Sequence, residues 1–581
     1  MSMPRSAAAL CLMFMAGVAC NLAPLATGQA PPPQAPPPQA SPIPTSQATV
    51  SPAPVQHQIG VRQGAGGMEF YDVVTGERFV PRGLNYNRWV FRDSPTAGRI
   101  LVAALFNTEW GELDQAEADL QQMAELGFNT LRIWKNACWG EVGGCIGDLQ
   151  GGLSDTYLNN VVEFLHMAKR HGFVVIFTDD WIPDDGGYSQ RLQRGCCDTF
   201  DGYNNVYLTE HGIAAERAYL QDFIQGLIDR KAPLDTILAY ELRNEAFYEA
   251  NMPPFSHSSG TVTAANALRY DMGSEADRQR LMEDGWLNYS QQLRQAAREL
   301  DPTALVTMGF FVQHGPNPVR QDDPRMVHLD RMIRESSLDF IDLHAYPGYD
   351  LDMRQHAENF AIIGEQTRLL LLGEYGADKA NYADAGSAAL VLANWQAASC
   401  DFGFDGWVMW SWDIPDYWAP LDGGGEVGQA LAPVNFPDPC STANLGSNLA
   451  LFRPVTASGS ESPEYGPEKA VDGSLGTWWS AGDGPPQSLE IDLGGASTIG
   501  RVVLQPGWVS AVGRQRIAVS VRGPGTGDEF IPFHTFDLSV ESDTPIEYVA
   551  PEPLTGIRWI RIETQLANGW VIWHDIEVYS E

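Results

Sequence analysis

Short apolar runs alternate with amphipathic stretches over residues 59–440. Residues 113–126 carry apolar side chains at positions 113, 116, 120, 123 and 124, a spacing that predicts a helix, and Gly127 ends it. Ser154 is a suitable N-cap for a second helix that runs to His171. Helices that alternate with apolar runs in this way indicate repeated βα units.

The apolar runs predict eight strands. Residues 173–177 and 369–372 lack the polar alternation of a half-exposed strand, so we expect them to be buried on both faces, as in a parallel sheet. The eight predicted strands are residues 79–85, 128–134, 173–177, 237–242, 304–308, 338–343, 369–372 and 407–409. This pattern predicts an α/β fold, a (β/α)8 TIM barrel over residues 59–440, with functional side chains at the carboxyl ends of the strands.

The pattern changes after residue 440. Helical periodicity is absent, and Gly, Ser and Thr separate short β-rich runs at residues 488–493, 501–504, 517–521 and 559–562. Residues 446–581 therefore predict a separate all-β domain, an antiparallel sandwich.

The first 30 residues resemble an export signal. Arg5 precedes an apolar run over residues 7–18, which is too short to span a membrane as a mature helix. Residues 17–20 resemble a lipoprotein cleavage motif, although Gly17 stands where Leu is usual. Lipidation at Cys20 and cleavage after a nearby small residue both remain open, and we expect an extracellular or cell-surface protein.

Residues 31–58 form a proline-rich linker. Ten prolines fall between Pro31 and Pro54, a composition that favours extended polyproline II and cannot build a core. This segment would hold the barrel away from a membrane to which Cys20 was anchored.

The charge of the chain restricts its partners. The sequence has 73 acidic and 37 basic residues, a formal net charge of −36, which would repel a phosphate backbone and excludes nucleic acid as a partner. An acidic surface suits a neutral substrate such as a polysaccharide. The 17 Trp and 19 Tyr fit a sugar-binding cleft as well as core packing. We expect a monomer.

Six cysteines follow the signal segment. An even number in an exported chain predicts disulfides. Of the fifteen possible connectivities, we expect one in which Cys400 pairs with Cys440 and the other four tie two loops together. These four are Cys138, Cys145, Cys196 and Cys197. A zinc site is the weaker interpretation, because no His lies beside these cysteines at metal-ligand spacing.

Polar and aromatic side chains stand at the predicted strand ends. Glu245 follows the fourth strand and Glu374 the seventh. Their expected companions are Arg132, Asp179, Asn244, His344, Tyr346 and Trp410. Two carboxylates with an aromatic platform suit glycoside cleavage. In that reaction one acid protonates the leaving oxygen, and the other, as a carboxylate, stabilises or attacks the oxocarbenium-like carbon.

The surroundings suggest separate roles. We expect Glu374 to be the nucleophile, because Arg132 and Tyr346 could hydrogen-bond its ionised form. Glu245 would be the acid and base, kept protonated at first by burial and by the charge of Glu374. Asn244 could reach the sugar 2-hydroxyl. Asp179 could either contact a hydroxyl or cap a loop.

The same strand-end motifs resemble a known family. Asn244-Glu245, His344-x-Tyr346, Glu374 and Trp410, together with residues 79–85 and 126–132, look like clan A glycoside hydrolases, closest to glycoside hydrolase family 5. The resemblance implies a retaining mechanism without a catalytic cofactor. It also implies that Arg132 and Tyr346 support the nucleophile and that Trp410 forms the floor of the sugar site. Residues 178–181 stand where many members carry a His, which leaves subfamily and substrate open.

The C-terminal motifs resemble the discoidin or coagulation factor type C domain, a galactose-binding-like sandwich shared by carbohydrate-binding module family 32. These motifs are residues 448–450, 470–473, 477–479 and 489–494. The resemblance implies a structural calcium held by Asp472, the Thr477 region and an acidic residue of the last strand, with Asp575 preferred over Glu577. Trp508 and Trp570 lie in turn-like contexts and could stack on sugar or belong to the core.

The sequence therefore predicts a retaining β-glycoside hydrolase acting on a β-linked polysaccharide, either β-mannan or β-glucan. A non-catalytic surface glycan-binding protein and a transglycosylase are the alternatives.

Overall fold

The structure is a computed structural model that describes most of the chain from residue 56 onward, with short gaps. The predicted signal segment and nearly all of the linker lie outside the described residues, as do Cys20, Cys138, Cys196, Cys197 and Trp508. The described residues are 56–64, 66–94, 98–109, 111–136, 144–194, 198–311, 325–348, 351–365, 367–382, 384–440, 448–451, 453–473, 477–507, 513–540 and 545–580.

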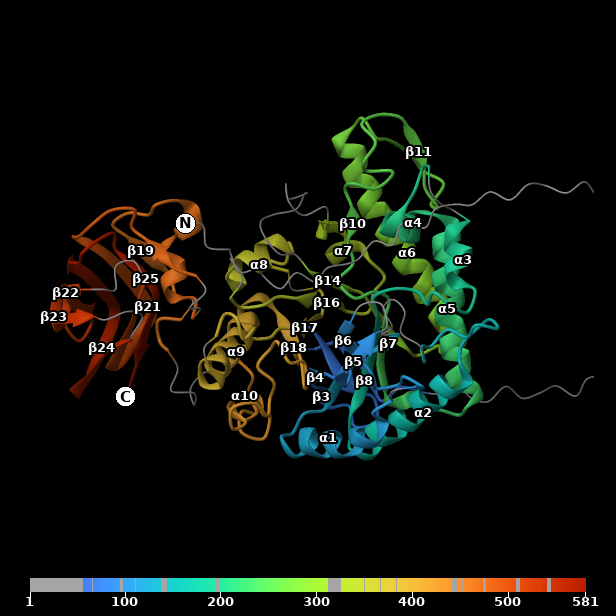
Figure 1. The fold of residues 1–581 in the computed structure, drawn as a ribbon, viewed down its shortest axis with the longest axis horizontal. Helices are drawn as coiled ribbons and strands as arrows, with labels where there is room; N and C mark the ends of the chain where they lie inside the picture. Colours follow the sequence, from blue (N-terminus) through green and yellow to red (C-terminus); the bar gives the residue numbers. More distant parts are fainter. Residues whose placement is uncertain are drawn as a thin grey trace, which may run out of the picture. The chain divides into compact units, whose positions relative to one another are not determined.

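Parallel strands form a barrel, as predicted (Figure 1). The strands are β4 (Arg82–Asn85), β7 (Thr130–Asn136), β8 (Val174–Asp179), β9 (Ile237–Glu241), β13 (Leu305–Thr307), β14 (Gly309–Phe311), β16 (Ile341–His344), β17 (Leu370–Glu374) and β18 (Phe404–Met409). β13 pairs with β9 and β14 pairs with β16, and only Met308 separates these two strands. One stretch of chain thus supplies the fifth position and closes the cylinder.

Helices surround the barrel (Figure 1). They are α1 (Leu113–Glu125), α2 (Asp155–Arg170), α3 (Tyr188–Gln193), α4 (Gly202–Leu208), α5 (Glu210–Asp229), α6 (Glu275–Leu300), α7 (Asp330–Glu335), α8 (Met353–Asn359), α9 (Ala385–Ser399) and α10 (Glu426–Leu431). The predicted cap is confirmed, because the Ser154 side chain accepts a hydrogen bond from the Tyr157 backbone at the start of α2.

Small antiparallel sheets lie outside the cylinder. They are β1 (Ile59–Gln63) with β2 (Met68–Asp72) and β3 (Arg78–Phe79); β5 (Trp89–Ser94) with β6 (Gly98–Ala103); β10 (Tyr248–Glu249) with β15 (Arg325–Met326); and β11 (Thr261–Thr263) with β12 (Arg269–Asp271). The predicted first strand, residues 79–85, is thus split between β3 and β4. Pro81 lies at the break, where a residue without an N–H cannot donate to a sheet ladder.

The barrel interior is apolar toward the amino ends of the strands. Ile176, Leu371 and Val408 are buried there in one cluster with Ile59 of β1 and Phe70 of β2. The small β1–β2–β3 sheet therefore covers the amino ends of the strands. This leaves the carboxyl ends as the open face of the barrel.

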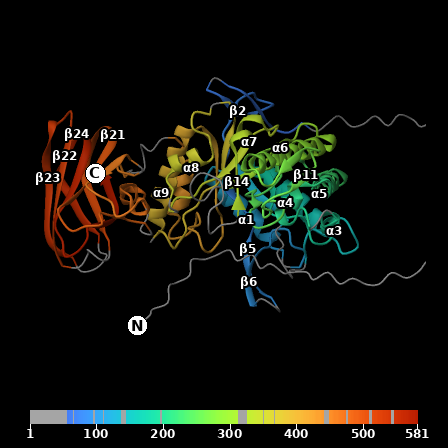
Figure 2. The same cartoon turned by 90° about the horizontal axis from the view of Figure 1, so that it is seen from above.

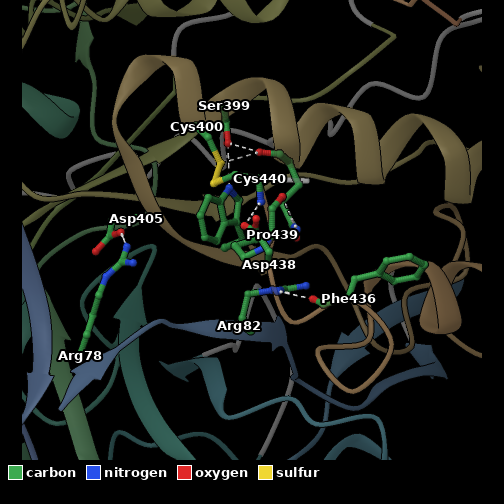
Figure 3. Close-up of a disulfide and its surroundings, with 11 residues drawn as sticks. Arg78, Arg82, Ser399, Cys400, Asp405, Phe436, Asp438, Pro439 and Cys440 are labelled. Carbon is green, nitrogen blue, oxygen red and sulfur yellow. Dashed lines mark hydrogen bonds and ion pairs between the residues drawn. A yellow bond between two sulfur atoms is a disulfide. The ribbon is translucent and has the colours of Figure 1, made fainter. Parts of the chain in front are cut away.

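Cys400 and Cys440 form the predicted disulfide, which joins the chain just after α9 to the end of the barrel segment (Figure 3). Close by, the buried Arg82 guanidinium donates hydrogen bonds to the Leu431 and Phe436 carbonyl oxygens. Cys145 is also disulfide-bonded. These contacts fasten the last turns of the barrel segment against its first strand.

The C-terminal domain is an antiparallel sandwich, as predicted. Its strands are β19 (Val455–Ala457), β20 (Trp479–Ser480), β21 (Gln487–Pro506), β22 (Gly513–Gly523), β23 (Gly527–Val540), β24 (Ile546–Leu566) and β25 (Ile572–Tyr579). Residues 488–493 and 501–504, which the sequence predicts as two strands, are both part of β21. Register shifts between Asp492 and Arg501 bend this strand without ending it.

Within the described part of the chain, no helix combines the length and the apolar character that crossing a membrane requires.

Candidate active site

The barrel brings the two candidate glutamates together. Glu374 is the last residue of β17, His344 is the last residue of β16, and Glu245 follows β9. One carboxylate oxygen of each glutamate and one ring nitrogen of His344 all lie within 4.8 Å of one another. Strands that are distant in sequence thus place both acids at one point of the open face.

Both oxygens of Glu374 accept hydrogen bonds from the two predicted partners. Arg132 donates to Oε1 over 2.5 Å, and the Tyr346 hydroxyl donates to Oε2 over 2.6 Å. Only 5% of the Glu374 side chain is exposed. The carboxylate is therefore fixed in one orientation by donors alone, an arrangement that suits an ionised acceptor.

Arg132 is the centre of the network beneath the glutamates, and its side chain is fully buried. Its Nε and Nη2 each donate to Glu241 over 2.8 Å, a bidentate pair, and Nη2 also donates to Asn244 Oδ1 over 2.6 Å. Its Nη1 donates to Asn85 Oδ1 over 2.9 Å as well as to Glu374. Every nitrogen of the guanidinium is engaged, so the direction from which it approaches Glu374 is set.

A second pair of carboxylates, Glu241 and Asp342, lies fully buried below the first. Asp342 Oδ2 lies 3.4 Å from Arg132 Nε, and Asp342 Oδ1 lies 3.8 Å from His344 Nε2. Glycines make room for both acids. A Cβ on Gly309 would overlap the Glu241 carboxylate, and one on Gly373 would overlap that of Asp342.

Glu245 differs from Glu374 in exposure and backbone. Its φ is +41°, in the left-handed region, which costs a non-glycine residue on the order of 1–3 kcal/mol. Flanking backbone bonds hold the turn, from Asn244 N to Asp179 O and from Ala246 N to Gly309 O. The side chain is 27% exposed. Glu245 is therefore the more solvent-accessible of the two acids.

His344 lies between the two glutamates. Its Nδ1 is 3.1 Å from Glu245 Oε1 and 3.5 Å from Glu374 Oε2. Burial lowers the pKa of His344, but the negative charge of Glu374, together with the nearby carboxylates of Asp342 and Glu245, raises it to about 10. The imidazole is thus a buried positive charge shared by four carboxylates.

The pKa directions of the glutamates are the reverse of those expected from the sequence. Burial raises the pKa of Glu374, although His344 and Arg132 oppose it. Burial also acts to raise the pKa of Glu245, but the hydrogen bond and charge of His344 outweigh it and hold this pKa below its ordinary value. The difference arises because Glu374 is the more deeply buried acid and because His344 hydrogen-bonds Glu245.

The side chain of Asn244 is held by two charged neighbours. Its Oδ1 accepts from Arg132, and its Nδ2 donates to Asp180 Oδ1 over 2.8 Å. Asp179, the predicted substrate contact, is 3% exposed and forms an ion pair with Lys135. The side chain of Asn244 thus bonds the side chain of Asp180, whereas Asp179 reaches Asn244 only through its backbone carbonyl.

Aromatic rings line the same end of the barrel. Trp410, which follows β18, lies 5.5 Å from Trp134 of β7 between ring centroids, and Trp89 of β5 lies 6.1 Å from Trp410. Tyr346 belongs to the same cluster. The predicted platform residue Trp410 is 7% exposed. It is therefore one wall of an aromatic cluster that includes two tryptophans which the sequence argument did not assign.

The residues expected to hold calcium lie together in the sandwich. The Thr477 hydroxyl donates to Asp472 over 2.7 Å, and Gly473 N donates to Asp575 over 3.4 Å. Asp575 is 3% exposed, and burial followed by the charges of Glu577 and Asp472 raises its pKa well above the usual range. Converging carboxylates at a buried position fit a divalent cation with oxygen ligands.

A register shift explains how Asp575 turns inward. In β25, Asp575 pairs with Gln505 while Trp573 pairs with Pro506, so the strand is irregular around His574. Asp575 and Ile576 are both buried as a result, against strict alternation, and Glu577 is only partly buried.

Trp570, one of the two tryptophans expected to stack on sugar or to belong to the core, is 47% exposed.

Comparisons with known proteins agree with this geometry. The model of the cellulase family (glycosyl hydrolase family 5) matches residues 96–415, and that of the F5/8 type C domain matches residues 454–577. No curated protein matches the chain.

Two solved structures are similar over the barrel and one over the sandwich. The endo-1,4-beta-mannanase from Rhizomucor miehei is 15% identical and covers 65% of this chain and 100% of its own, with a TM-score of 0.42. The exo-beta-1,4-mannosidase Op5Man5 from Opitutaceae bacterium strain TAV5 is 19% identical and covers 62% and 56%, with a TM-score of 0.39. The family 32 carbohydrate-binding module of C. perfringens NanJ, in complex with galactose, is 18% identical and covers 22% and 93%, with a TM-score of 0.20.

The family 5 match spans more than half of the 581 residues, and the fold and the paired glutamates agree with it. The chain belongs to glycosyl hydrolase family 5 and carries a C-terminal F5/8 type C domain.

Proposed function

We propose that this protein is a retaining β-glycosidase that hydrolyses a β-linked polysaccharide, β-mannan or β-glucan, by double displacement. The observation that carries this proposal is the spacing of the two acids, whose nearest oxygens lie within 4.8 Å. Retaining glycosidases hold their carboxyl groups about 5–5.5 Å apart, whereas inverting enzymes need about 6.5–9.5 Å to admit a water molecule.

Glu374 is the nucleophile in this proposal. Its oxygens are held by Arg132 and Tyr346, so the carboxylate is positioned for attack on the anomeric carbon. Attack breaks the glycosidic bond and forms a covalent ester between the sugar and Glu374. The leaving oxygen receives its proton from Glu245.

Substrate binding would shift the pKa values of the two acids by different amounts. The sugar would cover the 27% of Glu245 that is exposed, and this added desolvation would raise its pKa toward the protonated form. Glu374 is already almost fully buried, so its pKa would change less. The proton that Glu245 needs is within reach, since the charged Nδ1 of His344 lies 3.1 Å from its Oε1.

In the second step Glu245 acts as the base. It takes a proton from water, the resulting hydroxide attacks the anomeric carbon, and the bond to Glu374 breaks. Two inversions give net retention. Asn244, which Arg132 and Asp180 hold in place, is suited to hydrogen-bond the 2-hydroxyl of the reacting sugar.

The C-terminal domain, which follows the catalytic domain in the chain, would bind carbohydrate. Trp570 offers an exposed ring for stacking, and Asp472, Thr477 and Asp575 would hold the structural calcium. We propose an extracellular or surface location for the whole chain, with Cys20 as the lipid anchor if the signal is of the lipoprotein type. Radiolabelled palmitate incorporation that disappears in Cys20→Ser tests the anchor.

A panel of polysaccharides tests the activity. We expect wild-type protein to release reducing ends from a β-mannan or a β-glucan, with products identified by mass spectrometry, while Glu374→Ala releases none. Proton NMR during early turnover should show the β-anomer first. Inversion would contradict the retaining mechanism.

Two outcomes of the panel favour the alternatives. Binding without release of reducing ends in wild type would favour a glycan-binding protein. Longer products at high acceptor concentration would favour a transglycosylase.

A further inference from the structure

The β5–β6 hairpin stands on the open face of the barrel. Three residues separate it from the end of β4, and it lies in the connection that leads to α1. In Figure 2, β2 lies toward one end of the barrel and β5 and β6 project from the other. Since the β1–β2–β3 sheet covers the amino ends of the strands, the hairpin extends from the face that holds the two glutamates.

Charged contacts fasten the base of the hairpin to two neighbouring elements. Asp413, three residues beyond Trp410, accepts hydrogen bonds from Arg88 Nη1 and from the Trp89 backbone N, both over 3.2 Å. Arg88 also pairs with Glu112 and Asp119, at the start of α1 and within it. The first residues of β5 are therefore fixed relative to the strand end that carries Trp410.

One face of the hairpin continues the aromatic cluster of the site. Trp89 packs edge-on against Trp134, with ring centroids 5.4 Å apart, and lies 6.1 Å from Trp410. Its cross-strand partner Ala103 is buried in the same cluster. This face of the hairpin thus begins at the rings that line the catalytic end of the barrel.

Phe91 is the next side chain on that face. Residues two apart on a strand point the same way and lie about 6.6–6.8 Å apart. Phe91 is 46% exposed, and the Arg99 guanidinium lies 4.5 Å from its ring centroid. The cation covers one side of the ring and orients it, which leaves an apolar surface open to solvent beyond Trp89.

We propose that the Trp89–Phe91 face of the hairpin binds sugar units of the β-linked chain that lie beyond the unit held between Glu245 and Glu374. The proposal rests on the proposed function and extends it. Pyranose faces are apolar and stack on aromatic rings, and a second ring one step farther from the glutamates would contact only a substrate long enough to reach it. The preferred substrates are therefore extended chains rather than disaccharides.

Phe91→Ala tests the proposal, with Ile363→Ala as its matched control. Ile363 is 49% exposed and lies between α8 and β17, at the opposite end of the barrel. Soluble β-1,4-glucomannan is the long substrate, and the 4-nitrophenyl β-mannobioside and β-cellobioside are the short ones. We expect Phe91→Ala to lower kcat/KM on the polymer about three- to tenfold more than on the short glycosides, mainly through KM. Ile363→Ala should leave both unchanged.

Equal losses on long and short substrates, or no loss on either, would overturn the proposal. Calorimetry with mannohexaose and cellohexaose separates this result from a failure of the proposed function. If wild type hydrolyses nothing but binds a hexaose, and Phe91→Ala weakens that binding while Ile363→Ala does not, the subsite stands without the activity. If neither hexaose binds wild type, the subsite is refuted.

Discussion

The barrel and the sandwich both bury carboxylates, but they compensate the charge in different ways. In the barrel, Glu241 and Asp342 are fully buried, and Arg132 and His344 lie against them. In the sandwich, Asp575 is nearly as buried and faces Glu577 and Asp472, and none of the ion pairs found among the described residues includes it. Burial of an uncompensated charge is expensive, so the carboxylates around Asp575 fit the calcium proposed above.

This difference separates two uses of acidic side chains. The barrel supplies its positive charge from Arg132 and His344. These side chains fix the orientation of Glu374 and set the charge around Glu245 before substrate binds. The sandwich would obtain its positive charge by binding the proposed calcium, so we expect its stability to depend on the calcium concentration. Each of the following predictions alters either the charged network of the barrel or the acidic site of the sandwich.

Replacement of Arg132 should have the largest effect on stability. Arg132→Met leaves Glu241, Asp342 and Glu374 without their main counter-charge and should destabilise the barrel by about 3–5 kcal/mol in chemical denaturation, as well as abolishing turnover. Arg217→Met is the control, because Arg217 forms an exposed pair with Glu299 worth less than about 1 kcal/mol. Equal losses in the two variants would show that the buried network is not what stabilises the barrel.

Removal of calcium should act on the sandwich alone. At a hundredfold excess over Kd, a ligand stabilises by about 2.7 kcal/mol, so chelation should lower the Tm of the sandwich transition on the order of 10 °C. Asp575→Asn should remove this calcium dependence, whereas the exposed Asp537→Asn should keep it. A wild-type Tm that does not respond to calcium would mean that the buried acids are compensated in another way.

Gly373→Ala should disturb the barrel site through packing. The added methyl group overlaps the Asp342 carboxylate, which cannot move away within a buried network, and overpacking of this kind costs about 1–3 kcal/mol. Gly66→Ala meets no neighbouring atoms and serves as the control. Differential scanning calorimetry compares the two. A neutral Gly373→Ala would show that Asp342 has room to relax.

His344→Gln should shift the pH dependence of kcat/KM. The positive charge of His344 lowers the pKa of both Glu245 and Glu374. Without it both values rise, so the acidic limb set by Glu374 and the alkaline limb set by Glu245 should both move to higher pH by about one unit or more. Movement of either limb to lower pH would contradict the shared charge.

Much of this arrangement can be predicted from the sequence. Strand ends are visible as apolar runs followed by polar residues, and parallel topology places those residues on one face, which is how Glu245, Glu374, Arg132 and Tyr346 are found. Pattern alone cannot decide between neighbours. Asp179 and Asp180 are adjacent in sequence, and only the structure shows that the side chain of Asp180 bonds the side chain of Asn244 while that of Asp179 pairs with Lys135.

The buried acids were missed for a related reason. Glu241 and Asp342 lie inside strands that read as apolar, and only the packing of Gly309 and Gly373 reveals the space they occupy. In the sandwich, the irregularity around His574 turns Asp575 inward, which strict alternation of inward and outward side chains does not predict.

The covalent role of Glu374 can be tested most directly by trapping the intermediate. A 2-deoxy-2-fluoro β-glycoside with a good leaving group, mannosyl or glucosyl according to the polysaccharide panel, slows the second displacement more than it prevents the first. Peptide mass spectrometry of the inactivated protein should then show one sugar attached to Glu374. A sugar on Glu245, or turnover of the glycoside without any covalent adduct, would contradict the double displacement.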